Sequence, residues 1–270
     1  MLAITCVKQV PDTTQVRVDP VTNTLVREGV PFIMNPFDTH ALEEALRLKD
    51  EFGFRVAVIS MGPPNTALML RQALALGADE AVLLCDRAFA GADTLATSRV
   101  LAAAIRKLAQ DEEVALVLCG KQTIDGDTAQ VGPGIATRLG YPQLTLVDRI
   151  ESLDLASRRV RVRRRLEGRF ERVEAPLPAL ITVTREMNRL RYPTVPGRLA
   201  AEDATVTLWS NEELQLSAQT IGLKGSPTQV RRIFSPERVR GEIVGDGVAD
   251  ANVSVRLLLD KLLEADVLPL

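Results

Sequence analysis

Apolar runs typical of β-strands alternate with helical patterns through the first half of the chain. The strand-like runs are "LAITCV", "RVAVIS", "EAVLLC" and "VALVLC", which begin at residues 2, 55, 80 and 114. Apolar residues recur at helical spacing between them, over residues 36–52, 67–76 and 94–110. This order predicts an α/β, doubly wound fold, in which a parallel sheet carries helices on both faces.

The first of these helices has well-placed residues at both ends. Asn35 stands at the cap position, Pro36 at the first helical position and Asp38 in the first turn, while Gly53 follows the last apolar residue. These residues predict a helix over 36–52. Asn35 is expected to cap it with its side chain.

Two stretches with strict alternation predict hairpins. The first is short, at residues 16–26, and the second spans 158–174 with a turn at Glu167 and Gly168. Six arginines stand in the first strand of the second hairpin, over residues 158–165. A solvated edge strand, charged against sheet-to-sheet pairing, is favoured over an RNA-binding patch.

A final core strand at residues 179–184 is expected to close the main domain, which we place at 1–184. Residues 185–270 then form an extended arm that ends in a helix. Ser210 and Glu213 have capping-box spacing in the arm. Val255, Leu258 and Leu259 recur at helical spacing near the end, and this helix is expected to pack on another surface, of this chain or of a partner.

Composition narrows the classes of partner. The net charge of −2 gives no general attraction to nucleic acid. The aromatic content of 4% is too low for a surface on which bases would stack, so we expect no binding to nucleic acid. No apolar run approaches the ~20 residues of a membrane helix, and the N-terminus lacks a signal-peptide pattern, so we expect no membrane insertion and a cytoplasmic protein. Three scattered cysteines and one histidine give no metal-ligand spacing, so no metal is expected.

The stretch "GKQTIDGDTAQVGP", residues 120–133, carries the candidate chemistry. Neither a GxGxxG nor a GxxxxGK[ST] motif occurs in the chain. Gly120 would let the backbone leave the sheet, and Gly126 would take a positive φ. Asp127 and Thr128 suit the cap of a helix that begins at about residue 128, whose free N–H groups would bind an anion such as a phosphate.

The two carboxylates of this loop have roles that fit a nucleotide. One of Asp125 and Asp127 would cap the helix, and the other would accept a hydrogen bond from a ribose hydroxyl. A capped helix with an acidic loop and no ligand explains the same pattern equally well. The turn at Asn35 and the "SMGP" stretch with Met61 end at the same edge of the predicted sheet, and together they favour a nucleotide pocket there.

The motifs "CVKQVPD", "NPFDTHALEEALRLK", "SMGP", "ALALGAD" and "GKQTIDGDTAQVGP" together resemble the β subunit of electron transfer flavoprotein over about residues 1–200. The resemblance implies an adenine nucleotide α hydrolase-like fold and a heterodimer with an α subunit that carries FAD. It also implies a dehydrogenase or quinone oxidoreductase as redox partner. The pocket of this chain would hold a second FAD in the electron-bifurcating branch, which takes electrons from NADH, or AMP in another branch.

The loop sequence "DGDTAQVGP" and the later "IGLKGSPTQVRRIFSP" resemble the bifurcating branch. The alternatives are a structural AMP-binding subunit of a single-FAD carrier and a stand-alone adenine-nucleotide enzyme or sensor. No catalytic residue of its own is expected. The cofactor-binding residues that the resemblance implies are Cys6, Asn35, Pro36, Phe37, Asp38, Met61, Gly120, Lys121, Gln122, Thr123, Ile124, Asp125, Gly126, Asp127, Thr128, Ala129, Gln130 and Val131.

Partner binding is expected in the arm, at Arg191, Tyr192 and Val195. Here the chain departs from the family pattern Asn-Glu-Pro-Arg-Tyr. Arg189 and Leu190 replace the acid and the proline, and the hydrophobic anchor position falls on Val195.

Overall fold

The computed structural model describes residues 1–12, 17–18, 25–26, 31–230 and 241–267. The chain divides into two compact units, Met1–Arg231 and Arg232–Leu270, and each is described by itself. The domain boundary predicted near residue 184 falls inside the first unit, since the following arm packs with the main sheet.

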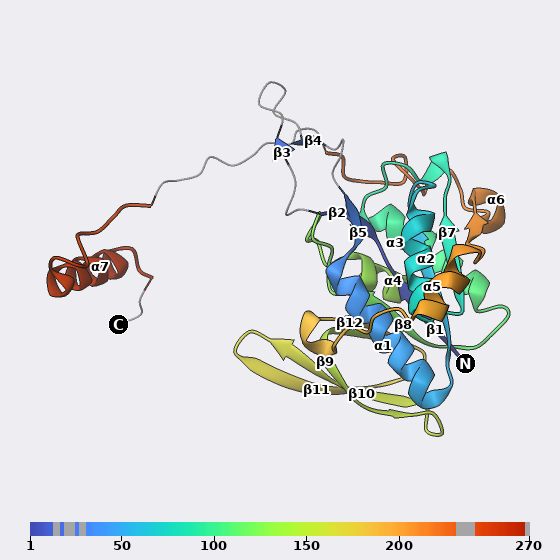
Figure 1. The fold of residues 1–270 in the computed structure, drawn as a ribbon. Helices are drawn as coiled ribbons and strands as arrows, with labels where there is room; N and C mark the ends of the chain where they lie inside the picture. Colours follow the sequence, from blue (N-terminus) through green and yellow to red (C-terminus); the bar gives the residue numbers. More distant parts are fainter. Residues whose placement is uncertain (13–16, 19–24, 27–30, 231–240, 268–270) are drawn as a thin grey trace. The chain divides into compact units, whose positions relative to one another are not determined.

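A nine-stranded sheet runs through the described part of the first unit (Figure 1). Its strands are, in spatial order, β11 (Arg169–Pro176), β10 (Arg159–Leu166), β9 (Gln143–Asp154), β12 (Ala179–Val183), β8 (Val114–Gly120), β1 (Leu2–Cys6), β6 (Arg55–Met61), β7 (Glu80–Leu84) and β13 (Thr207–Trp209). Pairing is parallel from β9 to β13, whereas β10 pairs antiparallel with both β9 and β11.

Helices cover both faces of the parallel strands. The helices α1 (Pro36–Phe52) and α2 (Thr66–Leu76) pack on one face, and α3 (Thr94–Leu108) and α4 (Val131–Leu139) pack on the other (Figure 1). Neighbouring strand residues alternate between the two cores: Ala3 belongs to the α1 side, whereas Ile4 belongs to the α3 side. The predicted doubly wound α/β fold is therefore confirmed.

The strand order creates a switch point beside β1. From β1 the chain adds β6 and then β7 on one side, and after α3 it crosses over to place β8 on the other side of β1. The connections that leave the carboxyl ends of β1 and β8 therefore diverge to opposite faces of the sheet. A crevice at such a point is where open α/β sheets bind their ligands.

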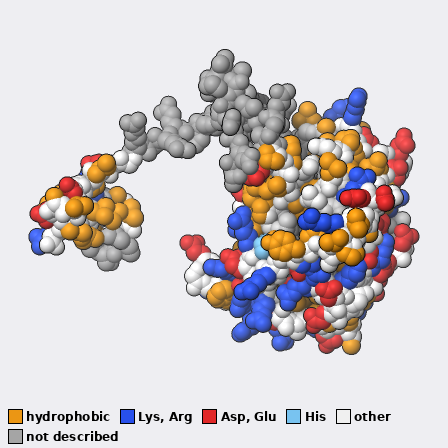
Figure 2. Space-filling view, in the orientation of Figure 1, with side chains coloured by type: hydrophobic (Ala, Val, Ile, Leu, Met, Phe, Trp, Pro, Cys, Tyr) orange, Lys and Arg blue, Asp and Glu red, His pale blue; other side chains and the backbone are white. Residues whose placement is uncertain are grey.

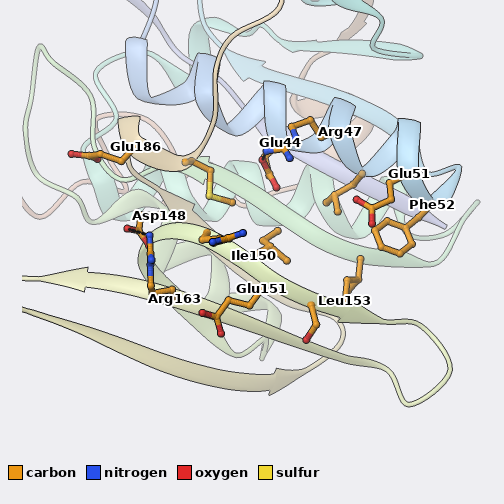
Figure 3. Close-up of a pocket in the computed structure, with 14 residues that line it drawn as sticks. Glu44, Arg47, Glu51, Phe52, Asp148, Ile150, Glu151, Leu153, Arg163 and Glu186 are labelled. Carbon is orange, nitrogen blue, oxygen red and sulfur yellow. Dashed lines mark hydrogen bonds and ion pairs between the residues drawn. The ribbon is translucent and has the colours of Figure 1, made fainter.

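The arginine-rich strand β10 lies between β9 and β11, so its prediction as an edge strand is wrong; β11 is the edge. Its arginines pair with carboxylates on neighbouring strands, which explains how so many charges fit on a strand inside the sheet. The local sequence does not show these partners. Arg163 donates from Nε and Nη2 to the two oxygens of Asp148, both at 2.9 Å, and Figure 3 shows these side chains next to each other. Arg161 pairs with Glu174 at 2.8 Å.

Shorter elements surround the main sheet. The strands β2 (Gln9–Pro11) and β5 (Phe32–Met34) form one antiparallel pair, and β3 (Arg17–Val18) and β4 (Leu25–Val26) form another, where the short hairpin was predicted. The turn residues of that hairpin lie outside the described residues. The described residues also include the 3₁₀ turns η2 (Arg87–Phe89) and η3 (Arg185–Met187).

The arm after β12 returns to the sheet. Helix α5 (Val195–Glu202) packs on α2, and β13 then joins β7. The short helix α6 (Asn211–Leu214) has the predicted capping box, formed by Ser210 and Glu213. The described part of the predicted arm up to residue 230 is therefore packed against the main sheet and its helices.

The second unit contains helix α7 (Ala251–Glu264). Its apolar side chains lie on the surface of this unit (Figure 2); Val255, Leu258 and Leu259 are each about half exposed. Within the ranges that the structure describes, no helix has the length and apolar character to span a bilayer.

Candidate functional site

The loop at residues 121–130 follows β8 and lies at the switch point, where the side chain of Asn35 holds it. Asn35 Nδ2 donates to the carbonyl oxygen of Gln122 at 2.9 Å, and its Oδ1 accepts from the N–H of Ile124 at 3.2 Å. Asn35 stands at the cap position of α1, yet its side chain makes no cap hydrogen bond. The predicted side-chain cap is therefore wrong, because the amide is used to fix the loop.

Asp38 joins the same elements from inside the protein. Its carboxylate accepts from the backbone N–H of Lys8 at 2.8 Å and from that of Gly120 at 3.1 Å, so it connects α1 to the ends of β1 and β8. Desolvation by burial raises the pKa of Asp38 to about 7, although the hydrogen bonds oppose the rise. The site therefore contains a buried carboxyl group that titrates near neutral pH.

Gly120 allows this close approach between β8 and α1. A Cβ atom built on Gly120 would lie 2.6 Å from the Cβ of Phe37 and 2.8 Å from its carbonyl carbon, closer than real Cβ contacts occur. Gly120 was predicted to let the chain turn off the sheet. The structure adds a packing reason, since the first turn of α1 leaves no room for a side chain.

The two loop carboxylates bind side chains of this chain. Asp125 pairs with Lys8 Nζ at 2.6 Å, and Asp127 accepts from Gln122 Nε2 at 2.7 Å. Burial raises the pKa of Asp125, but the hydrogen bond and charge of Lys8 help to bring it below its usual value. Lys8 was absent from the predicted site residues, although it stands inside the quoted "CVKQVPD" motif.

The helix after the loop begins later than predicted. α4 starts at Val131 with Gln130 at its cap position and no side-chain cap, so Asp127 and Thr128 do not cap it. Positive φ angles occur at Asp127 (50°) and Ala129 (54°), whereas Gly126, predicted to take one, does not. Residues 125–130 are exposed, and among the described residues no partner accepts from the backbone N–H groups of Thr128, Ala129 and Gln130.

The left-handed conformation of Ala129 gives a testable consequence. An L-residue with a Cβ atom is less stable there than glycine, by about 1 kcal/mol. Ala129→Gly is therefore expected to leave the free energy of unfolding unchanged or to raise it by up to about 1 kcal/mol, measured by urea denaturation. Ala103→Gly, inside α3, is the control and should lower it by about 1 kcal/mol. Equal losses in both variants would contradict the backbone conformation described here.

Other predicted site residues line the ends of neighbouring strands. Cys6 ends β1 and is the register partner of Cys119 on β8; both thiols are free and buried. The hydrogen bond with Cys6, together with burial, raises the pKa of the Cys119 thiol. Met61 ends β6, where it is partly exposed, and the N–H of Gly62 donates to the carbonyl oxygen of Leu84.

A cleft of about 600 Å³ opens beside the loop. It brings together the first turn of α1, the end of β12, the tip of the β10–β11 hairpin and the loop itself. Its lining residues are Phe37, Lys121, Gln122, Ile124, Asp127, Leu146, Arg165, Leu166, Thr184, Arg185 and Glu186. Arg165 and Arg185 were not predicted as site residues, because no local pattern shows that the hairpin tip and η3 reach the loop.

The predicted partner-binding residues differ in their surroundings. Arg191 pairs with Glu43 at 3.0 Å and with Asp50 at 2.8 Å, so its side chain holds the arm against α1. Tyr192 is 91% exposed and Val195 is 72% exposed. The two exposed residues are thus available for contact from outside the first unit.

Comparison with known proteins identifies the family of this chain. The family model for the electron transfer flavoprotein domain matches residues 22–214. Protein FixA of Azotobacter vinelandii is 48% identical over 265 residues, which cover 97% of this chain and 94% of that protein. The electron transfer flavoprotein subunit beta of Clostridium acetobutylicum is 49% identical over 252 residues, covering 93% of this chain and 95% of that protein.

A third relative extends the match along the chain. The CarD subunit of the caffeyl-CoA reductase–Etf complex of Acetobacterium woodii is 47% identical over 269 residues, 99% of this chain and 100% of that protein. Its similarity therefore includes the arm and the second unit. The family model and these relatives together show that the chain belongs to the electron transfer flavoprotein family, and within it to the β subunits.

Proposed function

We propose that this chain binds FAD at the carboxyl edge of its parallel sheet and forms a heterodimer with an electron transfer flavoprotein α subunit. In that complex, in the cytoplasm, it moves electrons from NADH or a dehydrogenase to acceptors by flavin-based electron bifurcation. The resemblance of the "DGDTAQVGP" loop and the "IGLKGSPTQVRRIFSP" segment to the bifurcating branch supports the choice of FAD.

The observation that carries the proposal is the loop at residues 121–130, which Asn35 holds at the switch point. Its exposed N–H groups at Thr128, Ala129 and Gln130 precede helix α4, and the helix dipole favours a negative charge at that end. These residues fit a phosphate group. Thr128 is an exposed residue in the same stretch, and its hydroxyl would supply a further donor.

The surrounding residues fit the rest of a nucleotide. The backbone at Cys6 and Met61 and the turn at Asn35, Pro36 and Phe37 lie at the ends of β1, β6 and β5, where an adenine ring would contact peptide groups. Asp125 and Asp127, already oriented by Lys8 and Gln122, would accept hydrogen bonds from ribose hydroxyls. A bound flavin supplies the redox chemistry, and these residues supply binding and orientation.

Partner binding belongs to the same proposal. CarD is by its name a subunit of a complex with a reductase, and we propose that this chain also works with a dehydrogenase or quinone oxidoreductase. The exposed side chains of Tyr192 and Val195 are the contacts proposed for that partner. Arg191 would act indirectly, by holding the arm through Glu43.

The second candidate function is a structural AMP-binding subunit of a single-FAD carrier that accepts electrons from acyl-CoA dehydrogenases. The same loop favours it equally, because its phosphate and ribose contacts are common to AMP and FAD. The chain should be co-expressed with its α subunit, the purified dimer denatured with acid, and FAD and AMP quantified by chromatography. Two FAD per dimer support the proposal, whereas one FAD and one AMP support the second candidate.

Thr128→Ala is expected to weaken nucleotide retention at the loop of this chain about three- to tenfold, because one hydrogen bond to the phosphate is lost. Asp127→Ala should weaken it as well, since Gln122 loses its partner in the loop. Retention is measured as nucleotide per dimer after dialysis. Thr137→Ala is the matched control on the exposed side of α4, and unchanged retention in both loop variants would count against the loop assignment.

A further inference from the structure

Three cationic side chains from separate parts of the chain meet in the cleft beside the loop. Lys121 follows β8, Arg165 lies near the tip of the β10–β11 hairpin, and Arg185 begins η3 after β12. Phe37, in the first turn of α1, lies between these elements. Lys121 Nζ is 5.1 Å from the centroid of its ring and the guanidinium carbon of Arg185 is 4.7 Å from it.

Two of these cations form no close ion pair with a carboxylate of the described residues, although the charge of Lys121 helps to lower the pKa of Glu186 from a longer distance. Arg165 pairs with Glu186 at 2.9 Å, and the cleft's other carboxylate, Asp127, accepts from Gln122. In the part of the chain that the structure describes, neither Lys121 nor Arg185 has a carboxylate oxygen within 4.0 Å. The aromatic face positions both charges without neutralising them.

A second charged pocket in the same unit has the opposite balance of charge. It lies between α1 and strands β9 and β10, with a volume of about 450 Å³ (Figure 3). Its carboxylates, which belong to Glu44, Glu51, Asp148, Glu151 and Glu186, outnumber its arginines, Arg47, Arg149 and Arg163. Arg163 is bound to Asp148 through two hydrogen bonds. Of these two pockets, only the cleft beside the loop therefore has more cationic side chains than carboxylates.

We propose that this cleft is an oxyanion subsite, in which Lys121 and Arg185 bind a phosphoryl group next to the nucleotide loop. Arginine offers parallel N–H donors that match phosphate oxygens, and lysine adds a point charge. The volume of about 600 Å³ admits more than a single phosphate, and Leu146, Leu166 and Phe37 supply apolar surface for the rest of a ligand. The inference rests on the proposed function only in placing a nucleotide in the adjoining loop.

Two sources could supply this phosphoryl group. One is the phosphate chain of the nucleotide in the loop itself, which shares Lys121, Gln122 and Asp127 with the cleft. The other is a separate, second phosphate-bearing ligand. Inorganic pyrophosphate is a suitable probe, because it carries the required oxyanions and nothing else.

The test titrates the heterodimer with pyrophosphate by calorimetry, both with its nucleotide bound and after removal of the nucleotide by dialysis. Arg185→Gln is expected to raise the dissociation constant for pyrophosphate about tenfold, because one charge-assisted interaction is lost. Arg185→Lys should recover part of the affinity. Arg169→Gln is the control that removes the same charge elsewhere, since Arg169 begins β11, is not among the residues that line the cleft, and pairs with Glu171.

The two forms of the dimer distinguish the sources. Binding to both forms supports a separate ligand, and binding only after nucleotide removal supports the phosphate chain of the bound nucleotide. Absence of pyrophosphate binding in both forms, or an unchanged dissociation constant in Arg185→Gln, overturns the proposal. It is also overturned if Arg185→Gln leaves pyrophosphate binding intact but weakens association with the α subunit, which would make the cleft a protein contact.

Failure of the proposed function would look different from failure of this subsite. A dimer with neither FAD nor AMP in the β pocket contradicts the proposed function, whatever pyrophosphate does. The pyrophosphate titration still decides the subsite in that case, because the probe binds without a nucleotide in the loop.

Discussion

Gly120→Ala is expected to lower the free energy of unfolding by about 3 kcal/mol and to abolish the nucleotide binding that we propose at the loop after β8. The added methyl group would lie 2.6 Å from the Cβ of Phe37 and 2.8 Å from its carbonyl carbon, so backbone as well as side chain must move. The first turn of α1 cannot move alone. Asp38 binds the N–H of Gly120, and Asn35 binds the loop that follows.

A displacement of α1 would therefore also displace the loop at residues 121–130. Urea denaturation gives the change in stability, and chromatography of the acid-denatured dimer gives the nucleotide content. Gly126→Ala is a control in the same loop, because its new Cβ would meet only Thr123 Oγ1, at an ordinary 3.6 Å. That variant should change stability by less than about 0.5 kcal/mol. Similar behaviour of the two variants would show that Gly120 is not needed for close packing.

The fold was largely predictable from the sequence, because its signals are local. Apolar runs such as "VALVLC" identified strands buried on both faces, and the alternation with helices indicated a parallel sheet. Pro36 and Gly53 marked the ends of α1 correctly: Pro36 is its first residue and Gly53 is left-handed at its C-cap. A three-residue strand such as β13 has too few positions to give a period, so it was not predicted.

The contact between two parts of the candidate site was predictable from the sequence, but its detailed geometry was not. The loop after β8 was identified from its sequence, and the turn at Asn35 indeed meets it. Yet Asn35 had two possible uses for one amide, a helix cap or a loop contact, and only the tertiary structure selects the second. The positive φ angles occur at Asp127 and Ala129 and not at Gly126, so the intrinsic preference of glycine did not predict which residues of the loop adopt them.

The arginines of β10 show a third limit of prediction from the sequence. Period-two alternation tells which side chains share a face of a strand, but it does not tell which strand lies next to it. The charged strand therefore looked like an edge, whereas Asp148 and Glu174 on its two neighbours accept from its arginines. The same limit hid Arg165 and Arg185. Arg165 reaches the cleft from the end of β10 and Arg185 reaches it from η3, and the sequence does not show that these two parts of the chain lie near each other.

The stability of the protein is expected to fall between pH 5 and pH 8 through the titration of Asp38. Burial raises the pKa of this carboxyl to about 7, against a value of 3.8 for an exposed aspartate. Below about pH 3.8 the group is protonated in both states and has no effect. As pH rises toward 7, the unfolded chain loses its proton first, so the folded state becomes relatively less stable; above about pH 7 the penalty is constant.

The Asp38 contribution between pH 5 and pH 8 amounts to about 2 to 3 kcal/mol. Asp38→Asn has no titrating group here, so the stability of the wild type relative to this variant should decrease by that amount over the same range. The comparison separates Asp38 from all other titrating groups, because both proteins share them. The variant also loses an acceptor for the N–H of Lys8 or Gly120, which lowers its stability at every pH without changing the slope.

Asp148→Asn is the matched control for this measurement. Asp148 is equally buried, but its carboxylate is bound to Arg163 on the neighbouring strand β10. That variant should lose stability and retain the pH dependence of the wild type, since Asp38 is present in both. If Asp38→Asn and the wild type instead show parallel stability curves from pH 5 to pH 8, the carboxyl is ionised throughout this range. Its two backbone hydrogen bonds would then stabilise the charge more than burial opposes it.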